Sequence, residues 1–193
     1  MRWVVFLRAV NVGGANRCQP ATIAKQLGKF GVVNIGAVGT FVVLENVSES
    51  TLRTAIAKRL PFKCEIMICP AKAIVDLVRQ NPFAGEASGP NITRFVNVLH
   101  KPLPVRSRST LRETSNVKPR TSELPALPFS LPSEKDWLLK IIAIENRFVL
   151  GLYRRDMKAI GYLGKIEKLF GVPATTRNWN TIEKVVKLLR QEA

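Results

Sequence analysis

The order of predicted elements over residues 2–70 constrains the fold of this chain more than any other feature. Apolar, β-rich runs predict strands, apolar residues three to four apart predict helices, and glycines and prolines mark where elements end. The predicted elements are a strand at Trp3–Val12, a helix from Pro20 to Phe30, strands at Val32–Ile35 and Phe41–Leu44, a helix carrying Leu52, Ile56 and Leu60, and a strand at Cys64–Cys69. This β-α-β-β-α-β order is the ferredoxin-like pattern, in which two helices cover an antiparallel sheet.

A degraded version of the same order follows in the second half of the chain. After a helix at Ala71–Gln80 and a linker at Phe83–Asn91, the predicted elements are strands at Arg94–His100, Trp137–Ile144, Arg147–Tyr153 and Val172–Thr175, a helix ended by Gly171, and a final helix. The proline-containing stretch Leu124–Pro132 is expected to be a loop. We therefore predict an α+β protein of two tandem ferredoxin-like (α/β plait) domains with a C-terminal helix, the domains spanning residues 1–83 and 92–193.

The balance of charge points to an anionic partner. The chain has 30 Lys and Arg against 14 Asp and Glu residues, a net charge of +16. Such a surface attracts polyanions, of which nucleic acid is the commonest. The densest basic run, Lys101–Arg120, is interpreted as a solvated loop or weak helix, with a clamp on a phosphate backbone as the alternative. We favour non-catalytic binding of an anionic partner such as nucleic acid through this basic surface.

The cysteines argue against several other classes of protein. Cys18, Cys64 and Cys69 are an odd number without paired-ligand spacing, so neither a disulfide framework nor a zinc site is predicted. We expect no cofactor and no metal. Free thiols, together with the absence of a signal segment or long apolar span, predict a cytoplasmic protein without a membrane partner, and they leave the oligomeric state open. Cys18 and the single histidine, His100, could form a nucleophile and base, but no spacing brings them together.

Two segments contain candidate ligand-binding residues. The first is the turn Asn11–Asn16, where Gly13 and Gly14 would let backbone N–H groups approach an anion. It lacks the spacing of a nucleotide-binding motif, and a tight strand-to-helix turn is the simpler interpretation.

The second is Thr176–Thr181, which combines a cation, amides, hydroxyls and an indole at the predicted start of the final helix. Asn180 is the expected helix cap, with Glu183 completing a capping box. Free N–H groups at a helix start can bind an anion, to which Arg177 would add a bidentate contact and Trp179 a stacking face. The simpler interpretation is that Asn180 is a cap, Trp179 is core and Arg177 is a surface charge.

Three stretches together resemble the uncharacterised family known as domain of unknown function 1697. They are Leu7–Asn16, Gln80–Phe83 and Thr176–Thr181. The resemblance implies two α/β plaits in tandem and no established activity. The chain departs from the family pattern in three places: Ala9 replaces a glycine, Val38-Gly39-Thr40 replaces Ser-Gly-Asn, and Gly161-Tyr162-Leu163 replaces Ser-Lys-Leu. A family site built on those polar groups would be incomplete here, which disfavours catalysis.

The candidate residues are therefore assigned to ligand binding, and none to catalysis: Arg8, Asn11, Gly13, Gly14, Asn16, Arg177, Asn178, Trp179 and Asn180. The alternative function is a small enzyme or sensor for a phosphorylated metabolite in the cleft between the domains. It requires the Asn11–Asn16 turn and the Arg177–Thr181 segment to converge on one cleft. If their polar groups are instead used in hydrogen bonds within the protein, the two segments are architectural.

Overall fold

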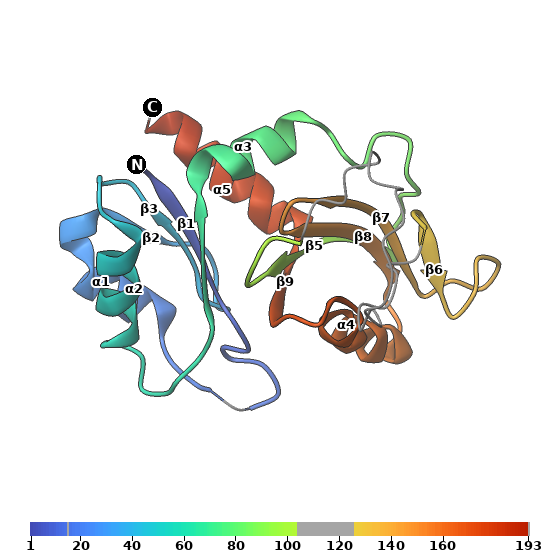
Figure 1. The fold of residues 1–193 in the computed structure, drawn as a ribbon, viewed down its shortest axis with the longest axis horizontal. Coiled ribbons are helices and arrows are strands. Elements are labelled where there is room, and N and C mark those ends of the chain that lie inside the picture. Colours follow the sequence, from blue (N-terminus) through green and yellow to red (C-terminus); the bar gives the residue numbers. More distant parts are fainter. Residues whose placement is uncertain (15, 104–125, 193) are drawn as a thin grey trace, which may run out of the picture.

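The computed structural model describes residues 1–14, 16–103 and 126–192. Within these ranges the protein is α+β, with two antiparallel sheets and five α-helices (Figure 1). The prediction of a basic loop or weak helix over Lys101–Arg120 falls, from residue 104 onward, outside the described residues.

The first sheet follows the predicted order of elements. Its elements are β1 (Trp3–Leu7), α1 (Pro20–Gln26), the 3₁₀ helix η1 (Gly28–Phe30), β2 (Val32–Asn34), β3 (Thr40–Val43), α2 (Glu49–Ala57) and β4 (Ile66–Pro70). The strands lie in the order β2-β3-β1-β4, and every neighbouring pair is antiparallel. The prediction that β1 continues to Val12 is wrong, because Ala9 and Asn11 have φ angles of 52° and 55° and turn the chain out of the sheet.

The second sheet contains β5 (Ile92–Leu99), β6 (Phe129–Leu131), β7 (Leu139–Glu145), β8 (Phe148–Arg154) and β9 (Ala174–Asn178), with helix α4 (Met157–Phe170) between the last two strands. Its order is β6-β7-β8-β5-β9. The predicted hairpin is confirmed as β7 and β8. Strand β6 contradicts the prediction of a loop over Leu124–Pro132: its prolines flank a three-residue edge strand, a position that tolerates proline.

The two sheets share one pattern of connection. Numbered by chain order, the first sheet places its second, third, first and fourth strands side by side, and β7-β8-β5-β9 repeats that arrangement. In each sheet the last strand leads directly into a helix, α3 (Ala71–Arg79) after β4 and α5 (Trp179–Gln191) after β9. The place that corresponds to α1 in the second half falls largely on residues outside the described ranges.

A hydrophobic core shared by both halves lies between the sheets. Helices α3 and α5 pack against each other there (Figure 1). Phe6 of β1 and Val96 of β5 belong to the same buried cluster. Phe83 is 3% exposed and packs edge-on against Trp179, with ring centroids 4.9 Å apart. The start of the predicted linker is therefore part of this core.

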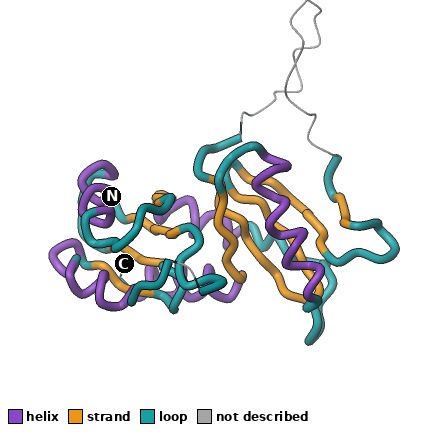
Figure 2. Tube along the Cα trace, turned by 90° about the horizontal axis from the view of Figure 1, so that it is seen from below, coloured by secondary structure: helices purple, strands orange, loops and turns teal. Residues whose placement is uncertain are grey.

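The outer faces of the two sheets have cores of their own. Helices α1 and α2 cover the first sheet, where Leu27 and Leu52 are fully buried. Helix α4 lies across the strands of the second sheet, as Figure 2 shows, and buries Ile166 against them. Arg147, at the start of β8, joins the halves, since its Nη1 donates to the carbonyl of Ile68 at 2.9 Å.

Candidate functional site

The two predicted ligand-binding segments meet at the turn of residues 36–39, between β2 and β3. The side-chain amide of Asn11 donates to the carbonyl of Ala37 at 2.7 Å, and its oxygen accepts from the N–H of Cys18 at 3.0 Å. From the other side, Nη2 of Arg177 donates to the carbonyl of Val38 at 2.8 Å. The segments therefore converge on one turn and bind its carbonyl oxygens.

Arg177 is the centre of this hydrogen-bond network. It is placed by the pairing of β9 with β5, in which Arg177 lies opposite Val96, and it is only 5% exposed. Its guanidinium donates to the hydroxyls of Thr40 and Thr175 and to the carbonyls of Thr176, Leu7 and Val38, at 2.7 to 2.8 Å. Every one of these acceptors is neutral and belongs to the protein.

Burial lowers the pKa of Arg177 to about 10. Because this pKa is still well above neutral pH, the side chain stays protonated there, and its five buried N–H donors require acceptors. The surface-charge interpretation of Arg177 is wrong, because the side chain lies between the two sheets. The hydrogen bonds across β1, β3 and β9 support an architectural role.

Gly39 makes this turn possible. Its φ angle is 71°, and a Cβ atom there would lie 2.8 Å from Cβ of Leu7. A side chain would push β1 away from the turn, and with it the Leu7 carbonyl that Arg177 binds. The close approach explains glycine at this position.

Arg8 forms a further link between the halves. It makes a bidentate ion pair with Glu167 of α4, at 2.6 and 2.7 Å, and Glu167 also accepts from the N–H of Ala174 at 2.9 Å. The hydrogen bond from Arg8 is the main cause that lowers the pKa of Glu167. Arg8 therefore also bonds to a protein acceptor, although the side chains of Arg8 and Glu167 are 38% and 30% exposed.

The Asn11–Asn16 turn is held by its own polar groups. The N–H of Asn11 donates to the carbonyl of Asn16 at 3.2 Å, and the Asn16 amide donates to the carbonyl of Ala9 at 3.2 Å. Gly13 and Gly14 are exposed, with φ angles of 61° and 80°. The backbone conformation therefore requires these glycines whether or not an anion binds.

The last segment is a strand that runs directly into a helix. Asn178 still pairs with Phe95 in the sheet, and α5 begins at Trp179, so the prediction of Asn180 as the cap is wrong. Asn178 holds the cap position but accepts no cap hydrogen bond through its side chain. Trp179 is core, at 5% exposed, as the simpler interpretation had it.

Asn178 and Asn180 differ from the other candidates because they face a cavity. The cavity has a volume of about 230 Å³, and both asparagines are exposed at its wall. Arg94 and Arg155 line it with them.

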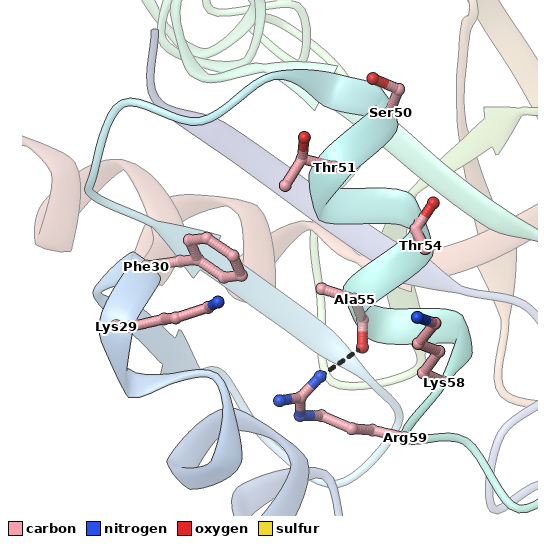
Figure 3. A pocket seen from close by; sticks show the side chains of 8 residues that line it. All are labelled: Lys29, Phe30, Ser50, Thr51, Thr54, Ala55, Lys58 and Arg59. Carbon is pink, nitrogen blue, oxygen red and sulfur yellow. Dashed lines mark hydrogen bonds between the residues drawn. The ribbon is translucent and has the colours of Figure 1, made fainter.

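A larger basic groove lies between η1 and α2, on the outer face of the first sheet (Figure 3). Its volume is about 460 Å³, and its lining combines three cations with three hydroxyls and no carboxylate: Lys29, Phe30, Ser50, Thr51, Thr54, Ala55, Lys58 and Arg59. We refer to these eight residues as the basic groove. This groove was not predicted from the sequence, although Ser50, Thr54 and Lys58 have the four-residue spacing that places side chains on one helix face.

The alternative catalytic pair finds no support in the geometry. Nδ1 of His100 lies 3.0 Å from a carboxylate oxygen of Glu65, and within the described ranges no hydrogen bond joins it to Cys18. Burial raises the pKa of the Cys18 thiol, which disfavours the reactive thiolate. Over the same ranges, no cluster of three or more His, Cys, Asp or Glu residues is arranged to hold a metal ion. Among the described helices, none has the length and apolarity needed to cross a membrane.

Comparisons with known proteins identify a family and a fold. The sequence model of the family described as "Protein of unknown function (DUF1697)" matches residues 1–123. A search of the curated proteins gave no match. The solved structure of conserved bacterial protein SP0830 from Streptococcus pneumoniae is similar over 97% of this chain and 98% of that one, with a TM-score of 0.54 and 13% identity. That likeness concerns the fold alone, whereas the family match covers more than half of the sequence: the chain belongs to the DUF1697 family of proteins of unknown function.

Proposed function

We propose that this protein binds nucleic acid, without catalysis, through the basic groove. The observation that carries the proposal is the lining itself, in which Lys29, Lys58 and Arg59 stand beside three hydroxyls without a carboxylate (Figure 3). Lysine, arginine and hydroxyl side chains are the groups that contact phosphate oxygens in nucleic-acid complexes. The net charge of +16 would draw a polyanion toward the groove.

No carboxylate of the described residues forms an ion pair with a cation of the basic groove. Arg59 uses one of its five N–H donors on the carbonyl of Ala55, at 2.9 Å, and Lys29 lies 4.8 Å from the Phe30 ring centroid. Glu49, at the start of α2, pairs with Arg53 at 2.8 Å instead. Phosphates would therefore meet cations with free donors, and Phe30 supplies an aromatic ring of the kind that stacks on bases in single strands.

The cleft between the two halves is the less favoured location for a ligand. An enzyme or sensor of a phosphorylated metabolite there would need the donors of Arg8, Asn11 and Arg177. Those donors bond to protein acceptors. This supports an architectural role for the family segments and favours binding at the outer face.

The proposal also includes the domain architecture and the cellular location predicted from the sequence. The strand order shared by β2-β3-β1-β4 and β7-β8-β5-β9 supports two α/β plaits, in domains spanning residues 1–83 and 92–193. The free thiols of Cys18, Cys64 and Cys69 support a cytoplasmic location.

Fluorescence anisotropy with a labelled single-stranded oligonucleotide tests the proposal. The groove variant, Lys29→Gln with Lys58→Gln and Arg59→Gln, should bind roughly tenfold or more weakly, and its salt slope should fall by about 2, which corresponds to three lost phosphate contacts on a single strand. The control variant, Lys168→Gln with Lys184→Gln and Lys187→Gln, removes the same charge from exposed positions outside the groove.

Two results would reject the proposal. If the groove and control variants lose affinity equally, the attraction comes from net charge and the groove is not the site. If the native protein does not bind at about 50 mM salt, where phosphate contacts are strongest, nucleic acid is not its partner.

A further inference from the structure

A second cavity, with a volume of about 230 Å³, lies where the linker, the start of β5, the end of β8 and the start of α5 meet. Its polar lining consists of Ser88, Thr93, Arg94, Arg155, Asn178 and Asn180. None of these residues belongs to the basic groove, so the cavity is a separate candidate for a ligand.

The protein orients both guanidinium groups of this cavity. Arg155 directly follows β8. Its backbone N–H donates to the carbonyl of Asn91 at 2.9 Å, and its side-chain Nε donates to the Thr93 hydroxyl at 3.4 Å. Arg94 lies over Phe83, with its guanidinium carbon 5.6 Å from the ring centroid. Within the described part of the chain, the Nε of Arg155 makes the one side-chain hydrogen bond found for the two arginines, so most of their N–H donors have no partner there.

The nearby carboxylates are engaged elsewhere. Glu86 pairs with Lys140 at 2.9 Å, and Asp156 accepts from the N–H of Lys158 at 2.7 Å as the cap of α4. Across residues 1–14, 16–103 and 126–192, neither Arg94 nor Arg155 makes an ion pair with a carboxylate. Arg94 and Arg155 therefore line one cavity without a counter-charge from these parts of the chain, and a bound anion would offset their positive charge.

The remaining polar groups add further donors. The Asn178 oxygen accepts from the Tyr153 hydroxyl at 3.5 Å, and the Asn178 NH₂ group donates to no acceptor among the residues that the structure describes. Asn180 provides a second exposed amide, and Ser88 a hydroxyl. Planar guanidinium groups bind phosphate through paired N–H donors, and amides and hydroxyls satisfy the remaining oxygens.

We propose that this cavity binds the phosphate group of a small phosphorylated molecule. The inference goes beyond the binding of nucleic acid, because it uses different residues and a different face of the fold. The volume exceeds that of a single phosphate group, so a phosphomonoester should bind at least as tightly as inorganic phosphate.

NMR titration of ¹⁵N-labelled protein at constant ionic strength tests this inference, with inorganic phosphate and glycerol 3-phosphate as probes against chloride. Shifts should be confined to residues 87–94, 155 and 178–180. Arg155→Gln and Arg94→Gln should each weaken binding about tenfold. Arg154→Gln is the matched control, because that neighbouring exposed arginine stacks on Trp137, at 4.8 Å from the ring centroid, and does not line the cavity.

The outcomes separate this inference from the proposed function. The groove variant should keep its phosphate response, so loss of nucleic-acid binding leaves the inference intact. Diffuse shifts, or equal affinity in Arg155→Gln and Arg154→Gln, would mean that phosphate senses only the net charge and would overturn it. Binding of inorganic phosphate without glycerol 3-phosphate would overturn the assignment to a small phosphorylated molecule. Arg155 is exposed, so its variant remains informative even if Arg94→Gln disturbs packing on Phe83.

Discussion

Arg177 and the basic groove use positive charge in opposite ways. Arg177 is 5% exposed, and protein oxygens accept its hydrogen bonds. In the groove, Lys29, Lys58 and Arg59 line an open cavity without a carboxylate. A buried, fully bonded cation holds a structure together, whereas exposed cations that repel one another are available to a ligand. Within the family segments, Arg8 and Arg177 bond to protein acceptors, so these two positions reveal the fold more than the activity.

Arg177→Ala should have the largest effect on stability. It would remove the donors to the carbonyl of Val38 and the hydroxyl of Thr40, and the carbonyl of Leu7 would keep only the longer hydrogen bond from the Thr175 hydroxyl, at 3.3 Å. We expect the free energy of unfolding to fall by about 3 kcal/mol or more. Urea denaturation measures this, with Arg177→Lys expected to recover only part of the loss. A loss below about 1 kcal/mol together with weaker anion binding would reverse the comparison and make Arg177 a ligand residue.

Gly39→Ala should come next. Its positive φ and the 2.8 Å approach to Leu7 predict a loss of about 2 kcal/mol. Gly13→Ala is the control, since Gly13 has a φ of 61° but no atom within 4 Å of the position of a Cβ. Its cost should be only the backbone term, about 1 kcal/mol. Equal losses would show that Leu7 can move aside and that the turn is less tightly fitted than the contact implies.

Glu167→Gln should have a smaller, pH-dependent effect. The pKa of Glu167 is lowered below 4.5 in the folded protein, chiefly by Arg8, so its ionised form contributes stability above the unfolded pKa. Because the pair is partly exposed, we expect a loss of about 1 kcal/mol at pH 7. The difference from the native protein should shrink as the pH falls through the folded pKa. Denaturation curves from pH 7 down to about pH 3 measure it. A difference that is independent of pH would mean that the negative charge of Glu167 does not contribute.

The groove variant should change stability least. Removing Lys29, Lys58 and Arg59 charges relieves repulsion and breaks no ion pair among the described residues, so the free energy of unfolding should stay within about 0.5 kcal/mol. Urea denaturation provides the measurement. A large loss of stability would mean that the groove cations hold the fold together, as Arg177 does.

The sequence predicted which helices and strands form, and in what order, better than it predicted where they end or what they contact. The order of elements up to residue 70 was predictable because apolar spacing reports local structure. The end of β1 was missed because positive φ at Ala9 cannot be read from composition. The start of α5 was misplaced because pairing with Phe95 keeps Asn178 in the sheet, a tertiary constraint.

The sites show the same limit. Lys29 and Arg59 line one groove only because η1 and α2 pack on one face of the sheet, and Arg94 and Asn178 line one cavity only because β5 pairs with β9. Arg177 was identified as important from its segment, but its burial depends on Leu7, Val38 and Thr40, which are more than a hundred residues away in the chain. Local patterns identify such residues and do not show what they bind.

The core shared by the two sheets also bears on how the chain folds. Phe6 and Val96 belong to one buried cluster, closed by α3 and α5. Each sheet would expose that apolar face to water if it formed alone, so we expect neither half to be stable by itself. We therefore expect that a destabilising substitution in one half also lowers the stability of the other, and that the chain unfolds as a single cooperative unit.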